Sequence, residues 1–174
     1  MKKLLPFILI LAVSVFSCKQ DKKDKGKDNP FFSEYDTPFG VPPFDKIKVE
    51  HFIPAFEKGM EEQREEVESI LENKEEPTFE NTIVAMDKTG KLLHRVAKTF
   101  FGLSSANTSP ELQAVQMEIS PRLAAHSDEI SLDPRFFDRV EAVYNDRAKF
   151  DLTKEEAFLL EHIYKELVQH PKNL

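Results

Sequence analysis

The clearest hydrophobic pattern in the chain lies between Thr78 and Asn107. Apolar side chains recur there at steps of three and four, which places them on one helix face opposite the charged residues. With Thr78 as N-cap, the pattern predicts one continuous helix of about 25 residues, roughly 38 Å long at 1.5 Å per residue. Because so long a helix cannot bury its stripe alone, we expect it at the centre of a helical bundle. The stripe comprises Ile83, Met86, Gly90 (a small-residue gap), Leu93, Val96 with Ala97, Phe100 and Leu103.

The segments that flank this stretch carry two further helical patterns. One runs over about 49–73, where Pro54 is tolerated because it falls in or near the first turn. The other begins after Ser109, a capping residue followed by Pro110 at the first helical position. Pro121 lies in the middle of this second pattern and is expected to kink the helix around the core. Its predicted buried positions are Leu112, Val115, Ile119, Leu123 and Ile130.

Two shorter helices are predicted toward the C-terminus. Asp133 repeats the signal of a capping residue before a proline and opens a helix over about 134–145. Thr153 and Glu156 form a capping box that opens the last helix, which ends before Pro171. No alternating strand pattern interrupts these segments, and the chain has only five glycines. The sequence therefore predicts an all-α fold, a bundle of about five helices.

An extended strap rich in phenylalanine and proline is expected to precede the helices, over about 29–48. Proline fixes φ and restricts the residue before it, so this segment is not predicted to form a helix. We expect its phenylalanines to pin the strap onto the bundle, although an aromatic ligand-binding groove is an alternative. These residues are Phe31, Phe32, Phe39 and Phe44.

Residues 1–17 are predicted to be a signal segment, with Lys2 and Lys3 ahead of an apolar run too short to span a bilayer. A small residue, Ser17, directly precedes Cys18, which is the only cysteine. This arrangement resembles a bacterial lipoprotein signal, in which the cysteine is acylated; the alternative is an ordinary secretory signal. We therefore expect lipidation at Cys18, membrane association through the lipid anchor, and a location in the cell envelope.

Residues 18–30 are predicted to be a solvated, disordered tether, which leaves 31–174 as one helical region. The whole chain carries a net charge of −7. Lys2 and Lys3 contribute +2, and the five lysines and three aspartates of 19–28 contribute another +2, so the chain from Asn29 onward carries −11. Such a charge repels nucleic acid, and we expect no nucleic-acid partner.

Several blocks of this sequence resemble the N-terminal region of the M3 zinc metallopeptidases, of the peptidyl-dipeptidase and oligopeptidase A type. They read N-P-F-F at 29–32, P-P-F-D-K-I-K at 42–48, H-F-I-P-A-F-E-x-G-M at 51–60, P-T-F-E-N-T-I-V-A-M-D-K-T-G-K-L-L-x-R-V at 77–96 and L-Q-A-V-Q-x-E-I-S-P-R-L-A-A-H-S-D at 112–128. The resemblance implies a mostly helical enzyme in which this region and a zinc-bearing domain enclose a substrate channel. Intact members of the peptidyl-dipeptidase branch remove C-terminal dipeptides from short peptides.

The residues of this chain offer no catalytic or metal site of that kind. A thermolysin-like zinc peptidase needs H-E-x-x-H on a helix, and none of the five histidines has that context. The nearest arrangement is His162 with Glu166, an i,i+4 pair that is common on helix surfaces. His126 is interpreted as a packing or hydrogen-bonding residue. The acidic face of the 49–73 helix is interpreted as a solvated face, with calcium binding as the alternative.

Two functional hypotheses follow. In the first, the chain is the N-terminal part of a peptidyl-dipeptidase-like lipoprotein: zinc and short peptides belong to the intact enzyme, and this part is inert alone. Under this hypothesis the chain's end at H-P-K-N-L is interpreted as a truncation or frameshift. In the second, it is a stand-alone helical lipoprotein that binds a peptide or protein partner. Whether the chain is itself an enzyme stays open.

Overall fold

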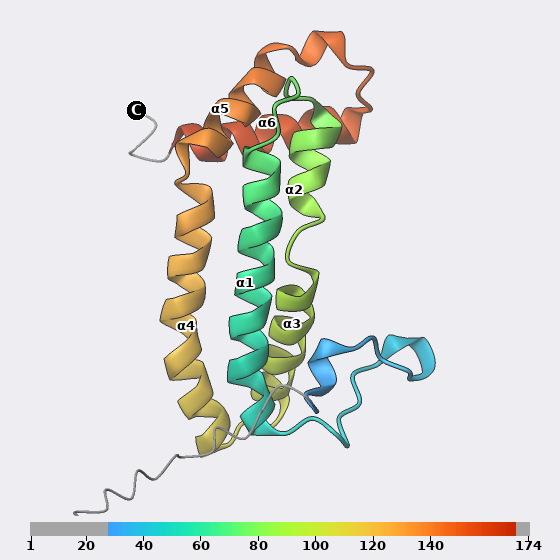
Figure 1. The fold of residues 1–174 in the computed structure, drawn as a ribbon, viewed down its shortest axis with the longest axis vertical. Coiled ribbons are helices and arrows are strands. Elements are labelled where there is room, and N and C mark those ends of the chain that lie inside the picture. The colour runs from blue at the N-terminus through green and yellow to red at the C-terminus, as the bar shows by residue number, and fades with distance from the viewer. Residues whose placement is uncertain (1–27, 170–174) are drawn as a thin grey trace, which may run out of the picture.

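The computed structural model describes residues 28–169, and the predicted signal, Cys18 and the chain end lie outside this range. The described region is all-α and contains no strand, as predicted. Five helices of twelve or more residues dominate it: α1 (Phe52–Leu71), α3 (Lys91–Ala106), α4 (Pro110–Ser131), α5 (Pro134–Asn145) and α6 (Lys154–Val168). Figure 1 shows α1, α3 and α4 standing side by side, with α5 and α6 across one end.

The first of two apolar cores joins α1, α3 and α4. Phe52 and Phe56 of α1 meet Phe100 of α3 edge-on, with ring centroids 5.0 and 5.6 Å apart. Such edge-to-face pairs add about 0.5–1.5 kcal/mol each beyond the area that they bury. Buried side chains of α4 close this core from the other side, at Leu112, Val115 and Ile119. The apolar stripes predicted for these three segments therefore face one another.

The second core lies where α5 and α6 cross the end of α1. Its buried members are Phe79, Ile83, Phe136, Val140, Val143, Leu160 and Leu167. Tyr144 and Tyr164 stack beside it with ring centroids 4.0 Å apart. Because this core draws on three separate segments, α5 and α6 hold the start of the 78–107 stretch in place.

The prediction of one continuous helix over 78–107 is wrong. The stretch begins as a π-helix, Phe79–Val84, passes through the short α2 (Ala85–Asp87), and breaks before α3. Gly90 has φ +68°, a left-handed conformation that favours glycine, and its N–H donates to Glu66 Oε2 at 2.7 Å. Thr89 Oγ1 donates to the Met86 carbonyl at 2.8 Å, which closes the turn. Gly90 is thus the breakpoint of the stretch and not a gap in one helix.

The other predicted helix boundaries are confirmed to within a few residues. Ser109, Asp133 and Thr153 each accept a hydrogen bond from the first turn of the helix that follows, and Thr78 does so for the π-helix. These caps satisfy backbone N–H groups that have no partner inside the helix. The helix over 110–131 runs through Pro121 without interruption, and Pro121 itself is exposed.

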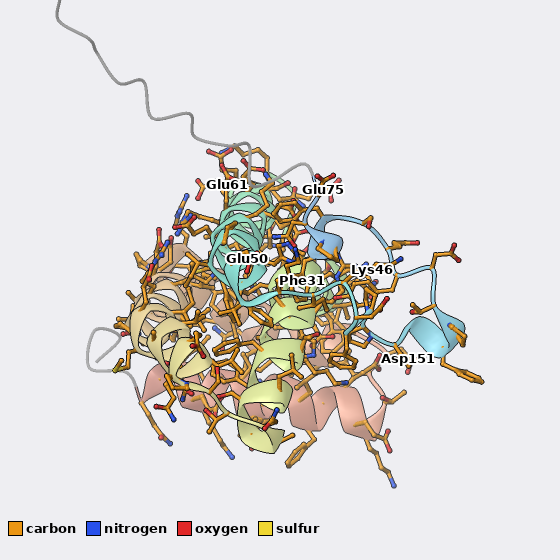
Figure 2. All side chains as sticks on the ribbon, turned by 90° about the horizontal axis from the view of Figure 1, so that it is seen from below. Phe31, Lys46, Glu50, Glu61, Glu75 and Asp151 are labelled. Atoms are coloured by element: carbon orange, nitrogen blue, oxygen red, sulfur yellow. The ribbon has the colours of Figure 1, made fainter. Side chains whose placement is uncertain are left out.

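The strap before α1 is only partly as predicted. Asn29, assigned to the tether, is buried, donates to the His51 carbonyl at 2.9 Å and caps a 3-10 turn, Pro30–Phe32. Phe31 is buried against Phe52, and its carbonyl accepts a hydrogen bond from Arg95. Figure 2, which views the molecule from below, labels Phe31 near the centre, among the helices. The other three phenylalanines, Phe32, Phe39 and Phe44, are exposed and do not pin the strap.

Candidate functional site: a polar groove between α3 and α4

A groove runs between α3 and α4, with α1 as its floor. Its volume is about 440 Å³. Apolar side chains of α3 and α4 line part of it, among them Leu93, Ala97, Leu123 and Ile130. Polar side chains line the rest, including Gln63, His94, His126 and Ser127. Apolar walls with a few polar groups are typical of sites that bind small molecules or peptide side chains.

A chain of hydrogen bonds crosses this groove. His126 Nε2 lies 2.8 Å from Gln63 Oε1, and Gln63 Nε2 donates to Thr89 Oγ1 at 3.2 Å. Thr89 in turn donates to the Met86 carbonyl. Gln63 Oε1 can only accept a hydrogen bond, so His126 Nε2 must be the donor and is the protonated ring nitrogen. These hydrogen bonds join α4 to α1 and α1 to the turn before α3, and they hold the side chains of Gln63 and His126 inward.

The opposite ring nitrogen of His126 is an unused acceptor. Its Nδ1 is buried and has no hydrogen-bond partner among the described residues. Burial lowers the pKa of His126, and nearby Arg64 lowers it further, while Glu129 acts in the opposite direction. The imidazole is therefore neutral at physiological pH and offers a lone pair at Nδ1.

The described residues that line the groove include two histidines, His94 and His126. Within the described part of the chain, no group of three or more His, Cys, Asp or Glu side chains could hold a metal ion. His51 Nδ1 already accepts from the Lys48 N–H at 3.1 Å. His162 lies 3.4 Å from Glu166 in an exposed pair on α6, as its spacing predicted. His126 has the hydrogen-bonding role expected of it.

Arginines bridge the acidic face of α1 to its neighbours. Arg135 of α5 donates to Glu68 at 2.7 and 2.9 Å, and Arg122 of α4 donates to Glu57 at 2.7 Å. These pairs are largely exposed, and each contributes little stability by itself. They are contacts between helices. The sequence analysis, which interpreted the acidic face of the 49–73 helix as solvated, did not predict them.

Sequence reasoning also missed Arg139, a residue of α5 whose side chain is buried. Its guanidinium donates to the Asn73 carbonyl at 3.0 Å and to Asn81 Oδ1 at 3.1 Å. Asn81 Oδ1 also accepts from the Thr78 N–H at 2.8 Å, so Arg139 ties α5 to the N-terminal cap of the π-helix. The signal was present in the sequence, because Arg139 falls three residues after Phe136 and directly before Val140, within the apolar stripe of its helix.

The helices of the described region are too short or too polar to cross a membrane. This finding covers residues 28–169 and does not extend to the predicted signal.

Comparison with known proteins identifies clear relatives, although no family model matches the chain. Over 140 residues, 80% of its length, the chain is 38% identical to dipeptidyl carboxypeptidase of Escherichia coli K12 and 37% identical to that of Salmonella typhimurium. It is 34% identical over 91 residues to oligopeptidase A of Escherichia coli. The match covers 21% of the two carboxypeptidases and 13% of oligopeptidase A, so the chain spans about a fifth of the length of the first two relatives.

Proposed function

We propose, from its homology to the N-terminal region of dipeptidyl carboxypeptidase and oligopeptidase A of the M3 family, that this chain is the N-terminal helical part of a peptidyl-dipeptidase-like zinc metallopeptidase. The observation that carries the proposal is the identity of 38% over 140 residues. In this role the helices form one wall of the space that holds a short peptide. The zinc and the catalytic residues belong to the remaining part of such an enzyme.

Alone, the chain is expected to have no peptidase activity. Zinc-dependent hydrolysis requires a metal whose bound water is acidified to near neutrality, held by three protein ligands beside an open position. The described histidines and carboxylates do not form such a ligand set. We expect the purified chain to retain no stoichiometric zinc after dialysis and to release no C-terminal dipeptide from a short peptide. Chelator-sensitive dipeptide release by the chain alone would contradict this.

A second candidate function is binding without chemistry, as a stand-alone helical lipoprotein that takes a peptide or protein partner. The groove between α3 and α4 favours it, because its apolar walls carry a few polar side chains, among them Gln63, His94 and His126. Titration of short peptides into the chain, followed by the imidazole NMR signals of His126, tests it. Saturable shifts of the His126 signals, which are assigned by their absence in His126→Phe, support peptide binding by the chain alone, and unchanged signals count against it.

We also propose that Cys18 carries the lipid anchor and places the protein in the cell envelope. Support comes from the sequence alone, from the short apolar run and the small residue before the only cysteine. Stable anchoring needs two acyl chains or an equivalent second signal, which a lipoprotein modification supplies. In a bacterial host the chain should sediment with membranes, and Cys18→Ser should release it or stall its processing. Recovery of the unaltered chain in the soluble periplasm, cleaved after residue 17, would refute the anchor.

A further inference from the structure

A protruding turn in the strap carries a phenylalanine in an unfavourable backbone conformation. Phe39 has φ +60° and ψ +17°, and Gly40 after it has φ +65°. The Val41 N–H donates to the Pro38 carbonyl at 3.4 Å, so Pro38 and Val41 close a turn whose two central residues both have positive φ. Turns of this kind favour Asn, Asp or Gly at the first central position, because a side chain with a bulky Cβ substituent crowds the backbone there.

The ring of Phe39 is not buried within the described region, so no burial of its apolar surface offsets the unfavourable backbone conformation. Its side chain is 103% exposed, more than any other large apolar side chain of the described region. Figure 1 shows the light-blue turn standing away from the helices. Val41 and Phe44 are about half exposed beside it. A fixed, exposed aromatic flanked by other apolar side chains is typical of an anchor in a protein interface.

The turn is also held in shape before any partner arrives. Thr37 Oγ1 donates to the Val41 carbonyl at 2.5 Å, and the Gly40 N–H donates to the Thr37 carbonyl at 3.1 Å. Pro38 restricts the backbone at the start of the turn. A rigid turn loses little conformational freedom on binding, which favours affinity.

We infer that the Phe39 turn is the docking anchor through which this helical region engages the rest of the peptidase, by inserting the ring into an apolar socket on that part. The inference rests on the proposed function. The relatives supply the occupant, because about four-fifths of dipeptidyl carboxypeptidase lies outside the match to this chain. Segment 34–50 holds four acidic residues and two lysines, so we expect basic side chains around the socket. The same negative charge disfavours an anionic membrane surface as the occupant.

The test measures binding of the mature chain, from residue 18 onward with Cys18→Ser, to the part of Escherichia coli dipeptidyl carboxypeptidase that the match leaves out. Phe39→Asn is the informative variant, because asparagine suits positive φ and keeps the turn while removing the ring. Phe39→Tyr keeps a ring of similar size. Phe158→Ala is the matched control, since Phe158 is 70% exposed on α6, away from the strap in sequence. Vesicles of phosphatidylethanolamine and phosphatidylglycerol serve as the membrane probe.

We expect Phe39→Asn to weaken binding at least about tenfold, as for an interface hot spot, while Phe39→Tyr and Phe158→Ala stay within about threefold of the unaltered chain. Equal binding by Phe39→Asn and the unaltered chain would overturn the docking anchor and leave the proposed function standing. No binding by the unaltered chain would count against both. Loss of vesicle binding in Phe39→Asn, with binding to the peptidase part unchanged, would overturn the inference in favour of a membrane contact.

Discussion

Gly59 of α1 lies where the backbone of α3 approaches closely, and replacing it with alanine sets two effects against each other. A Cβ at this position would lie 2.8 Å from Leu93 Cα and 2.9 Å from Leu93 N. Both are backbone atoms of α3, so the contact cannot be relieved by rotating a side chain. Gly59→Ala must therefore push α1 and α3 apart, which loosens the packing of Phe56 and Phe100 in the first core.

The size of the effect follows from two opposing contributions. Alanine is a better helix former than glycine by about 1 kcal/mol, which favours the variant. Overpacking a close helix contact costs about 1–3 kcal/mol, which opposes it. We expect the steric cost to exceed the gain in helix propensity, because the atoms that a Cβ would meet belong to the backbone. Gly59→Ala should therefore lower the free energy of unfolding by roughly 1–2 kcal/mol. For a domain of this size that lowers the melting temperature by about 3–6 °C.

Gly102, near the end of α3, is the matched control. A Cβ there would meet no atom within 4 Å, and the residue is exposed. Gly102→Ala should raise the free energy of unfolding by up to about 1 kcal/mol through helix propensity alone. Urea unfolding followed by circular dichroism measures both variants, and we expect shifts of opposite sign. If Gly59→Ala is as stable as Gly102→Ala, the close approach of α1 to α3 is not as described.

Two further substitutions test polar groups. His126 has a lower pKa in the fold than when unfolded, so its contribution is present above about pH 6.5 and is lost as the pH falls below that value. Between about pH 7.5 and about pH 5.5, urea unfolding should show a larger loss for the unaltered chain than for His126→Gln, and equal losses would contradict this. Arg139→Met leaves the Asn73 carbonyl and Asn81 Oδ1 without this donor and should cost about 1–3 kcal/mol. An unchanged urea midpoint would show that the two bonds contribute nothing.

Local chemistry made the helix starts predictable from the sequence. Ser109, Asp133 and Thr153 lie just before apolar patterns and carry side-chain oxygens that can cap a helix, and each of them does so. The stripe after Ser109 also predicted the three side chains of α4 that are buried in the first core, Leu112, Val115 and Ile119. Such signals depend only on neighbours within a few residues, so they can be recognised without knowing the tertiary structure.

Features that depend on distant residues were not predictable in this way. The break before α3 needs Glu66 of α1 to accept the Gly90 N–H, 24 positions away in sequence, and no local pattern announces that bond. The chain from His126 through Gln63 to Thr89 likewise joins three segments. Its members are unremarkable polar residues in the sequence, so the groove between α3 and α4 emerged only from the arrangement of the helices.

We propose that this chain supplies the N-terminal wall of a dipeptide-releasing peptidase. Escherichia coli dipeptidyl carboxypeptidase lacking the region matched here provides the test, with zinc present and release of C-terminal dipeptides from a short peptide as the readout. Neither part alone should release dipeptides at an appreciable rate. Adding the 174-residue chain should restore chelator-sensitive release that saturates with its concentration. If the enzyme fragment folds and binds zinc, but this chain neither binds to the fragment nor restores its activity, the proposed role as the N-terminal wall is contradicted.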